Sequence, residues 1–275
     1  DHWLFVSTTG GLSAGRINAD HALFPYYTED RIAENAANTG GKTILRVIQG
    51  GNTHIWDTFT DDLHNPYITE RILYKNTVGT SLIFEEVNHT LGLMFRYAWR
   101  TSAIYGVVRT CWLTNIGDAA ASMTITDGLQ NILPAFVTAQ TQNAMSVLLD
   151  AYKRTELHKG AGVGMYSLSS RLTDLAEPSE ALRANTVWQV GLDVETYLIS
   201  TKQLQAARTG QPIQIETDMR GKRGAYLVQS KVDLAPGASK SWHTVAEVDQ
   251  DNAAVTELIQ HIETHQADLY AMVEQ

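Results

Sequence analysis

The segment GGLSAGRINADHALFPYYTED, residues 10–30, holds side chains that suit more than one kind of chemistry. It offers a guanidinium and a carboxamide that hydrogen-bond, two phenol rings with flat faces, and a carboxylate. This mixture is too polar for a core strand and too aromatic for a plain linker. The residues alone leave three interpretations open: a rim that binds a sugar, a loop that binds a cofactor, or a surface loop that packs well. The side chains concerned are Arg16, Asn18, Tyr26, Tyr27 and Asp30.

Glu257, His261 and His265 are spaced four residues apart, so on a helix they share one face. Two histidines at this spacing can bind zinc, but a zinc site needs a third and a fourth ligand, which the sequence does not place. The three side chains also lie off the apolar stripe of their helix. We therefore expect a solvated helix face, with no metal and no other cofactor.

Motifs for nucleophilic catalysis and phosphate binding are incomplete in this chain. GLSAG (11–15) matches the residues of a Gly-x-Ser-x-Gly elbow, but the segment does not show the strand, turn and helix pattern that the elbow needs. TGGKT (39–43) has part of a phosphate-binding P-loop, but Ala36 stands where that motif needs glycine, and the strand-like ILRVIQ follows instead of a helix. A hairpin turn is expected there. Because acidic residues are numerous, composition singles out no carboxylate pair, and we predict no catalytic residue.

Short runs of β-branched and aromatic residues, separated by Gly, Asn and Asp, make up most of the chain. Strands at this spacing, without helices between them, favour a mainly β fold, a large antiparallel sandwich, over a βαβ fold. The runs lie at 43–49, 81–90, 91–99, 105–115, 121–128, 186–192, 196–201, 225–234 and 240–248.

The connections between these runs follow from turn residues and helical spacing. The turn residues at 115–118 predict a hairpin that joins the strands on either side. Apolar residues at helical spacing predict a helix over 141–157. The segment TDLAEPSEALRANT (173–186) is expected to be a loop.

The C-terminal segment carries the clearest helical pattern, and Asp251 or Asn252 can cap its start. Its apolar residues fall on one stripe at a period of 3.6, and the helix is expected to run to the last residue. An apolar face needs a surface to pack on, and none is evident in the sequence, so we read this helix as the beginning of something longer. The stripe consists of Val255, Leu258, Ile259, Ile262, Leu269 and Val273.

Composition excludes several classes of partner. The 275 residues carry a formal net charge of −9, and no basic cluster is evident, so nucleic acids and anionic membranes are disfavoured. No apolar run approaches the roughly 20 residues that span a bilayer. The single cysteine, Cys111, is expected to pack as a small apolar side chain and mildly favours the cytoplasm. At least four of the six tryptophans are expected in the core.

Three segments together resemble the N-terminal β-domain of glycoside hydrolase family 94, the family of cellobiose phosphorylase. DGLQNILP (127–134), preceded by Thr114 and Asn115, resembles a strand and turn of that family. TTGGLSAGR (8–16) is similar to its opening segment, although 12–27 departs from the phosphorylases. RGKRGAYLV (220–228), followed by LAPGASKSWHTVAEVDQD (234–251), is similar to the end of that domain.

The resemblance implies a fold and a set of partners. Residues 1–250 would form a β-supersandwich similar to galactose mutarotase, and 251–275 would begin a helical linker to an (α/α)6 barrel that carries the catalytic acid. The chain alone would be a non-catalytic scaffold and carbohydrate-binding domain of a cytoplasmic phosphorylase or hydrolase that acts on β-glucosides. Inorganic phosphate would be the co-substrate of a phosphorylase, and a homodimer is expected.

The same resemblance gives the 10–30 segment a role at the mouth of the barrel. Arg16 and Asn18 would hydrogen-bond sugar hydroxyls or phosphate, Tyr26 or Tyr27 would stack on a sugar face, and Asp30 would complete the set. The competing interpretation is a packed segment with Phe24 and Tyr26 in the core.

Two other functions fit the same scaffold. One is a complete aldose 1-epimerase, which needs a base for the anomeric hydroxyl and an acid for the ring oxygen. His158 or His89, paired with Glu247 or Glu85, would supply them. The other function is a stand-alone sugar-binding module, because a fold alone does not determine an activity.

Overall fold

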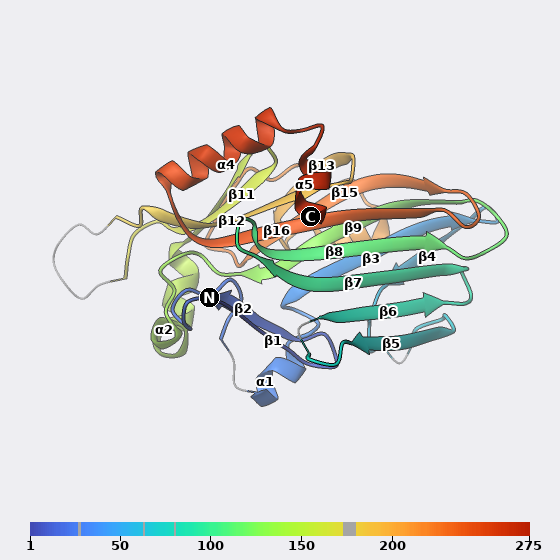
Figure 1. The fold of residues 1–275 in the computed structure, drawn as a ribbon, viewed down its shortest axis with the longest axis horizontal. Helices are drawn as coiled ribbons and strands as arrows, with labels where there is room; N and C mark the ends of the chain where they lie inside the picture. The colour runs from blue at the N-terminus through green and yellow to red at the C-terminus, as the bar shows by residue number, and fades with distance from the viewer. Residues whose placement is uncertain (27–28, 63, 80, 173–179) are drawn as a thin grey trace.

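The structure is a computed structural model, and it describes residues 1–275 apart from 27–28, 63, 80 and 173–179. Two stacked antiparallel sheets form the body of the molecule, and the helices lie outside them (Figure 1). Half of the loop expected at 173–186 lies outside the described residues, and its last residues, from Arg183, already belong to a strand.

The larger sheet has nine strands in the order β14-β10-β11-β12-β16-β8-β7-β6-β5. Every neighbouring pair in it is antiparallel. Its strands are β5 (Thr69–Lys75), β6 (Leu82–Asn88), β7 (Leu93–Ser102), β8 (Gly106–Asn115), β10 (Lys153–His158), β11 (Val163–Leu168), β12 (Arg183–Val190), β14 (Asp218–Arg220) and β16 (Ser239–Asp251).

The smaller sheet has five strands in the order β13-β15-β9-β3-β4, and a separate two-stranded ribbon pairs the N-terminal strands. The strands of the smaller sheet are β3 (Gly40–Gln49), β4 (Asn52–Asp57), β9 (Ala121–Ile132), β13 (Val194–Ser200) and β15 (Gly224–Leu234). The ribbon consists of β1 (His2–Val6) and β2 (Leu12–Arg16). The predicted antiparallel supersandwich is confirmed, and each of the nine expected strands is present.

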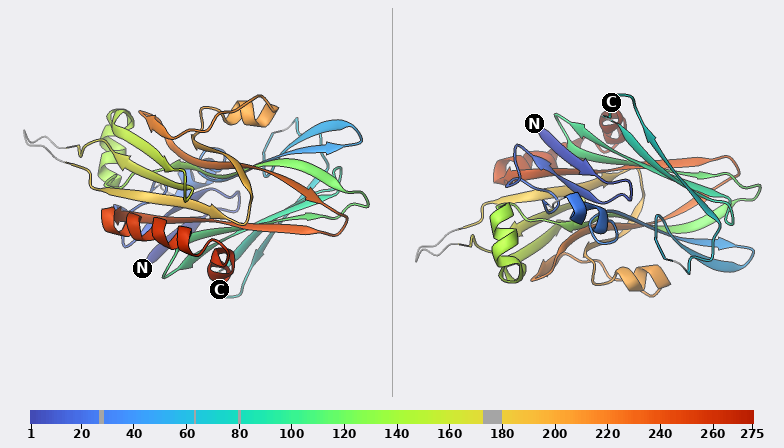
Figure 2. Two further views of the ribbon diagram at one scale, coloured as in Figure 1. Left: turned by 90° about the horizontal axis from the view of Figure 1, so that it is seen from above. Right: turned by 90° about the horizontal axis from the view of Figure 1, so that it is seen from below.

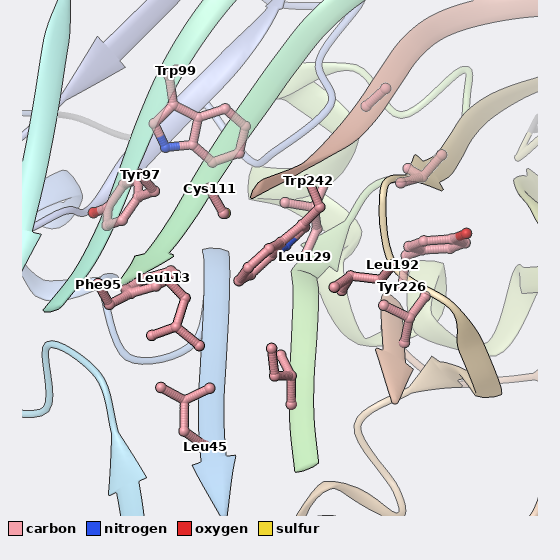
Figure 3. Close-up of a cluster of buried hydrophobic side chains, with 14 of the residues drawn as sticks. Leu45, Phe95, Tyr97, Trp99, Cys111, Leu113, Leu129, Leu192, Tyr226 and Trp242 are labelled. Carbon is pink, nitrogen blue, oxygen red and sulfur yellow. The ribbon is translucent and has the colours of Figure 1, made fainter. Parts of the chain in front are cut away.

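The core fills the space between the two sheets, where alternate side chains of each strand point inward (Figure 3). Phe95, Tyr97 and Trp99 of β7 face Leu45 of β3 and Leu129 of β9 across this space. As expected, Cys111 packs there as an apolar residue, with no exposed surface. The prediction for the tryptophans is also confirmed, because four of them are buried: Trp56, Trp99, Trp188 and Trp242.

The hairpin predicted around 115–118 is wrong. β8 belongs to the nine-stranded sheet and β9 to the five-stranded sheet, so the turn carries the chain from one sheet to the other. Asn115 holds this crossing, because its Nδ2 donates to the carbonyls of Ala119 (2.8 Å) and Leu234 (3.0 Å). Turn chemistry indicates that the chain reverses there, but it does not determine which strands pair afterwards.

The predicted helix over 141–157 is shorter than expected. α2 spans Ala139–Tyr152, and β10 begins at Lys153 because Lys153, Thr155 and Leu157 alternate inward at the period of a strand. The predicted apolar face is also wrong: Val147 is 86% exposed, and Leu149 is the only residue of α2 that is buried. Two shorter helices are α1 (Glu29–Glu34) and α3 (Leu204–Thr209).

The C-terminal helix is divided into α4 (Asn252–Thr264) and α5 (Leu269–Glu274). Asp251 caps α4, as predicted, by accepting a hydrogen bond from the Ala254 amide at 3.0 Å. Both helices lie on the outer face of the nine-stranded sheet (Figure 2). There Ile262 and Leu269 are buried together with outward-facing residues of β8, β12 and β16, namely Val108, Trp188 and Val245. The apolar stripe therefore has its partner surface within this chain, contrary to our expectation.

Within the described residues, no helix is both long enough and apolar enough to cross a membrane.

Candidate functional site

A groove with a volume of about 1150 Å³ lies between the N-terminal ribbon and the edge of the nine-stranded sheet. In the right-hand view of Figure 2 the dark blue ribbon lies beside the teal strands of that edge. We call this space the aromatic groove. Among the residues that line it are His2, Phe5, Tyr26, Lys75, Trp99 and Arg100.

Two aromatic rings, Phe5 and Tyr26, form one wall of the aromatic groove, and Trp3 packs against both of them. Tyr26 meets Trp3 edge-on at 5.6 Å between ring centroids, and it meets Phe5 at 6.3 Å. Trp3 fits because Gly15 lies opposite it on β2, where a Cβ atom would come within 2.5 Å of the indole. Mutual packing holds these rings, yet Phe5 remains 49% exposed and Tyr26 44% exposed. The wall is thus a preformed, solvent-facing aromatic surface.

The 10–30 segment is anchored on one side and exposed on the other. Leu23 and Phe24 are fully buried, and the Pro25 carbonyl accepts a hydrogen bond from Ser13 Oγ at 2.8 Å. Tyr26 follows directly and turns outward, so only half of the packed-loop interpretation is correct. Phe24 belongs to the core, whereas Tyr26 does not.

Arg16 and Asn18 are engaged in contacts with other protein groups. Arg16 bonds Glu247 of β16 through Nη1 (2.9 Å) and Asp1 through Nε (3.2 Å). Asn18 Oδ1 accepts from the Asp20 amide at 2.9 Å, and the Asn18 carbonyl accepts from Trp3 Nε1 at 3.0 Å. Neither residue lines the aromatic groove, so the structure does not bring them together with Tyr26. Their roles in binding stay predictions.

The two remaining predicted residues are outside what the structure describes. Tyr27 falls in a gap of the described chain, and the side chain of Asp30, within α1, is not described either. Sequence reasoning missed other residues of the groove: Phe5, Lys75 and Arg100. The short apolar run in HWLFV (2–6), which forms β1, is the signal that would have indicated Phe5.

His2 brings a titratable group to the aromatic groove. Burial lowers the pKa of His2, and the carboxylate of Glu247 opposes that shift. Its Nε2 is buried and has no hydrogen-bond partner among the described residues. The lowered pKa favours the neutral imidazole, so His2 lines the aromatic groove as a polar group without adding charge.

The histidine and glutamate pairs of the epimerase hypothesis are engaged elsewhere. His89 Nε2 lies 3.3 Å from Glu70, and His158 Nδ1 accepts from the Ala161 amide at 3.2 Å. Glu85 accepts hydrogen bonds from Tyr74 and Arg96, while Glu247 binds Arg16. No contact joins either histidine to either glutamate in the described part of the chain.

The helix face that carries Glu257, His261 and His265 assembles no group of three metal ligands among the described residues. His261 Nε2 lies 3.5 Å from the Tyr105 hydroxyl, and its ring packs on that of His265 at 4.6 Å. Burial lowers the pKa of His261, and His265 lowers it further.

A buried ionic cluster, which we call the core cluster, lies between the sheets. Arg109 of β8 donates to Asp127 Oδ1 (2.8 Å) and to Thr43 Oγ1 (2.9 Å), and Trp242 Nε1 donates to Asp127 Oδ2 (2.7 Å). Burial opposes the charge of Arg109, but the Asp127 carboxylate raises its pKa above the ordinary value. Because Asp127 is fully buried, the core cluster joins the two sheets and does not face a ligand.

Comparison with known proteins identifies the fold but assigns the chain to no family. No family model matches the chain, and no curated protein matches it. Among solved structures, a polysaccharide lyase superposes with a TM-score of 0.54 at 13% identity, over 95% of this chain and 34% of that one. The chain shares its fold with part of that lyase. It spans about a third of the lyase's length.

Two further solved structures resemble the chain more weakly. A galactose mutarotase-like protein from Clostridium acetobutylicum aligns over 90% of this chain and 91% of its own, at 9% identity and a TM-score of 0.44. A protein from the human microbiome, assigned as a kojibiose phosphorylase, aligns over 82% of this chain and 26% of its own, at 12% identity and a TM-score of 0.40.

Proposed function

We propose that this chain is a non-catalytic carbohydrate-binding and scaffold domain of a larger sugar-processing enzyme. The aromatic groove is the observation that carries the proposal. Sugar rings present apolar C–H faces, which stack on exposed aromatic rings, and hydroxyls at their rims, which need hydrogen-bond partners. Phe5 and Tyr26 provide such rings, and His2, Lys75 and Arg100 provide polar groups around them.

In the finer form of the proposal, the parent enzyme is a family 94 phosphorylase or hydrolase that acts on β-glucosides. Residues 1–250 form its sandwich domain, and 251–275 begin the linker to a helical catalytic barrel. Inorganic phosphate is the co-substrate if the enzyme is a phosphorylase. A homodimer and a cytoplasmic location belong to the same proposal.

The scaffold role is supported by the architecture around the groove. The fold is shared with part of a polysaccharide lyase about three times as long, so a sandwich of this kind also occurs within a larger carbohydrate-related protein. The residues of the epimerase hypothesis contact other protein groups instead of one another, namely His89, His158, Glu85 and Glu247. A binding role therefore fits the groove better than an epimerase role.

The test is binding of β-linked gluco-oligosaccharides to the isolated chain by titration calorimetry. We expect saturable binding that weakens about tenfold in Tyr26→Ala, because a stacked ring contributes roughly 1 kcal/mol or more. Tyr74→Ala is the matched control, since Tyr74 is 43% exposed and lines no part of the groove. Equal losses in both variants contradict the proposal. So does mutarotation of glucose by the chain, followed by polarimetry.

A further inference from the structure

A second cavity, with a volume of about 320 Å³, lies on the other side of Tyr26. α1, α2 and the turn before β15 surround it. Tyr26 lines both this cavity and the aromatic groove, so its ring stands between them. We call the second cavity the basic pocket. The residues that give it its character are Tyr26, Arg31, Gln142, Asp150, Lys153 and Arg223.

The basic pocket has a surplus of positive charge in a chain whose net charge is −9. Three cations and one carboxylate line it. Asp150 binds Lys153 Nζ at 2.7 Å and lies 3.7 Å from Arg223 Nε, so one carboxylate serves two cations. No ion pair joins Arg31 to any described residue. A pocket with unbalanced cations attracts an anion, because opposite charges in a partly enclosed site are weakly screened.

The positions of these cations are fixed by the fold. Lys153, the first residue of β10, is 6% exposed and follows the C-terminal end of α2, where a cation is favourable. Its carbonyl accepts from the Gly221 amide at 2.9 Å, which holds the turn that carries Arg223. Arg31 lies in the last turn of α1 and has no ion-pair partner among the side chains that the structure describes. It is therefore the guanidinium most available to a ligand.

We propose that the basic pocket binds the acidic substituent, a carboxylate or a phosphate, of a carbohydrate whose ring stacks on Tyr26. This inference rests on the proposed function, since it requires a sugar on the same tyrosine. Guanidinium groups pair with both kinds of anion through parallel N–H donors. Gln142 and Asn143 line the same pocket and offer carboxamides for sugar hydroxyls. The volume of the pocket is at the lower end of the range for small-molecule sites, roughly 300–1,000 Å³, and fits a single sugar unit.

The experiment compares three probes on the isolated chain: cellobiose, the same disaccharide with a uronic acid at its non-reducing end, and inorganic phosphate alone. We expect the acidic disaccharide to bind about tenfold more tightly than cellobiose at low salt, the change that one charge-assisted hydrogen bond produces. Raising the salt concentration is expected to reduce this preference without abolishing it, because the pocket is partly enclosed. A 6-phosphorylated cellobiose separates phosphate from carboxylate as the preferred substituent, and a preference for either supports the inference.

Arg31→Gln and Arg223→Gln test the pocket directly. Each is expected to reduce the affinity for the acidic disaccharide about tenfold and to leave that for cellobiose unchanged. Arg220→Gln is the matched control, because Arg220 is also on the surface, 70% exposed, and does not line the pocket.

The outcomes separate this inference from the proposed function. Equal affinity for the acidic and neutral disaccharides overturns the inference and leaves the proposed function intact. Binding of inorganic phosphate without any preference for the acidic sugar also overturns it, because the pocket would then hold a free anion. If neither disaccharide binds, both proposals fail together.

Discussion

The core cluster and the basic pocket both contain arginines, and their surroundings are opposite. Arg109 is 1% exposed and has two acceptor atoms and two aromatic rings around it, whereas Arg31 is exposed and has no ion-pair partner among the described residues. A buried charge must be compensated by the protein, because water is excluded. An exposed charge is compensated by solvent and stays free to bind. An ion pair within the core therefore marks the structural arginine, and an unpaired surplus of positive charge marks the candidate binding site.

The largest effect should come from breaking the core cluster. Asp127→Asn leaves Arg109 buried beside a neutral group, so we expect the free energy of unfolding to fall by about 3–5 kcal/mol. Urea denaturation measures this loss. The double variant Arg109→Met/Asp127→Leu removes both charges and should recover most of it. A loss below about 1 kcal/mol in the single variant would show that the cluster does not hold the sheets together.

An intermediate effect is expected at Lys153, which is buried but belongs to the basic pocket. Lys153→Met removes one partner of Asp150, whose side chain is 36% exposed and can be solvated instead. The expected loss is about 1 kcal/mol in the same denaturation assay. A loss as large as that of Asp127→Asn would mean that the pocket is a structural cluster, and it would contradict the comparison.

His243 tests how a buried group behaves when its charge depends on pH. Burial lowers its pKa, although Glu274, whose carboxylate lies 2.9 Å from Nε2, opposes the shift. The unfolded chain then binds the proton more readily, so stability falls as the pH drops below the ordinary histidine value of about 6.5. Urea midpoints between pH 7.5 and 5.5 should show this decline. His243→Asn should make it shallower, and His2 and His261, whose pKa values are also lowered, account for the rest.

The smallest effect on stability is expected at Arg31. Arg31→Gln removes an exposed charge without an ion-pair partner among the described residues, so the free energy of unfolding should change by less than about 0.5 kcal/mol. Thermal and urea unfolding measure it beside the binding assay proposed above. A clear destabilisation would assign Arg31 a structural role, and the contrast with Arg109 would disappear.

The strands could be predicted because their signal is local. In β9, for example, Met123 and Ile125 alternate with polar residues, and both are buried. The pairing of those strands could not be predicted, because it depends on residues distant in sequence. Asn115 illustrates this limit: its turn was visible, but its hydrogen bond to the Leu234 carbonyl, which holds the crossing between sheets, joins positions 119 residues apart.

The residues that carried the family resemblance have a structural role here. Asp127 accepts from Arg109 and Trp242 in the core cluster. Gly128, at φ +155°, lies so close to the Tyr226 carbonyl that an added Cβ would be 1.8 Å away. The motif therefore consists of residues that fit the two sheets together. Because its role is structural, it predicted the supersandwich but not the residues of a binding site.

The sequence by itself determined the mainly β class, the burial of most tryptophans and of Cys111, and the cap of the C-terminal helix, because each depends on neighbours within a few residues. The tertiary structure decided which strands share a sheet, what the apolar stripe of α4 covers, and which side of Tyr26 faces the aromatic groove. It alone assembled Arg31, Lys153 and Arg223 into one pocket. Charged residues that are far apart in sequence form a binding site only when the fold brings them close together, because electrostatic attraction depends on the distance between charges in space.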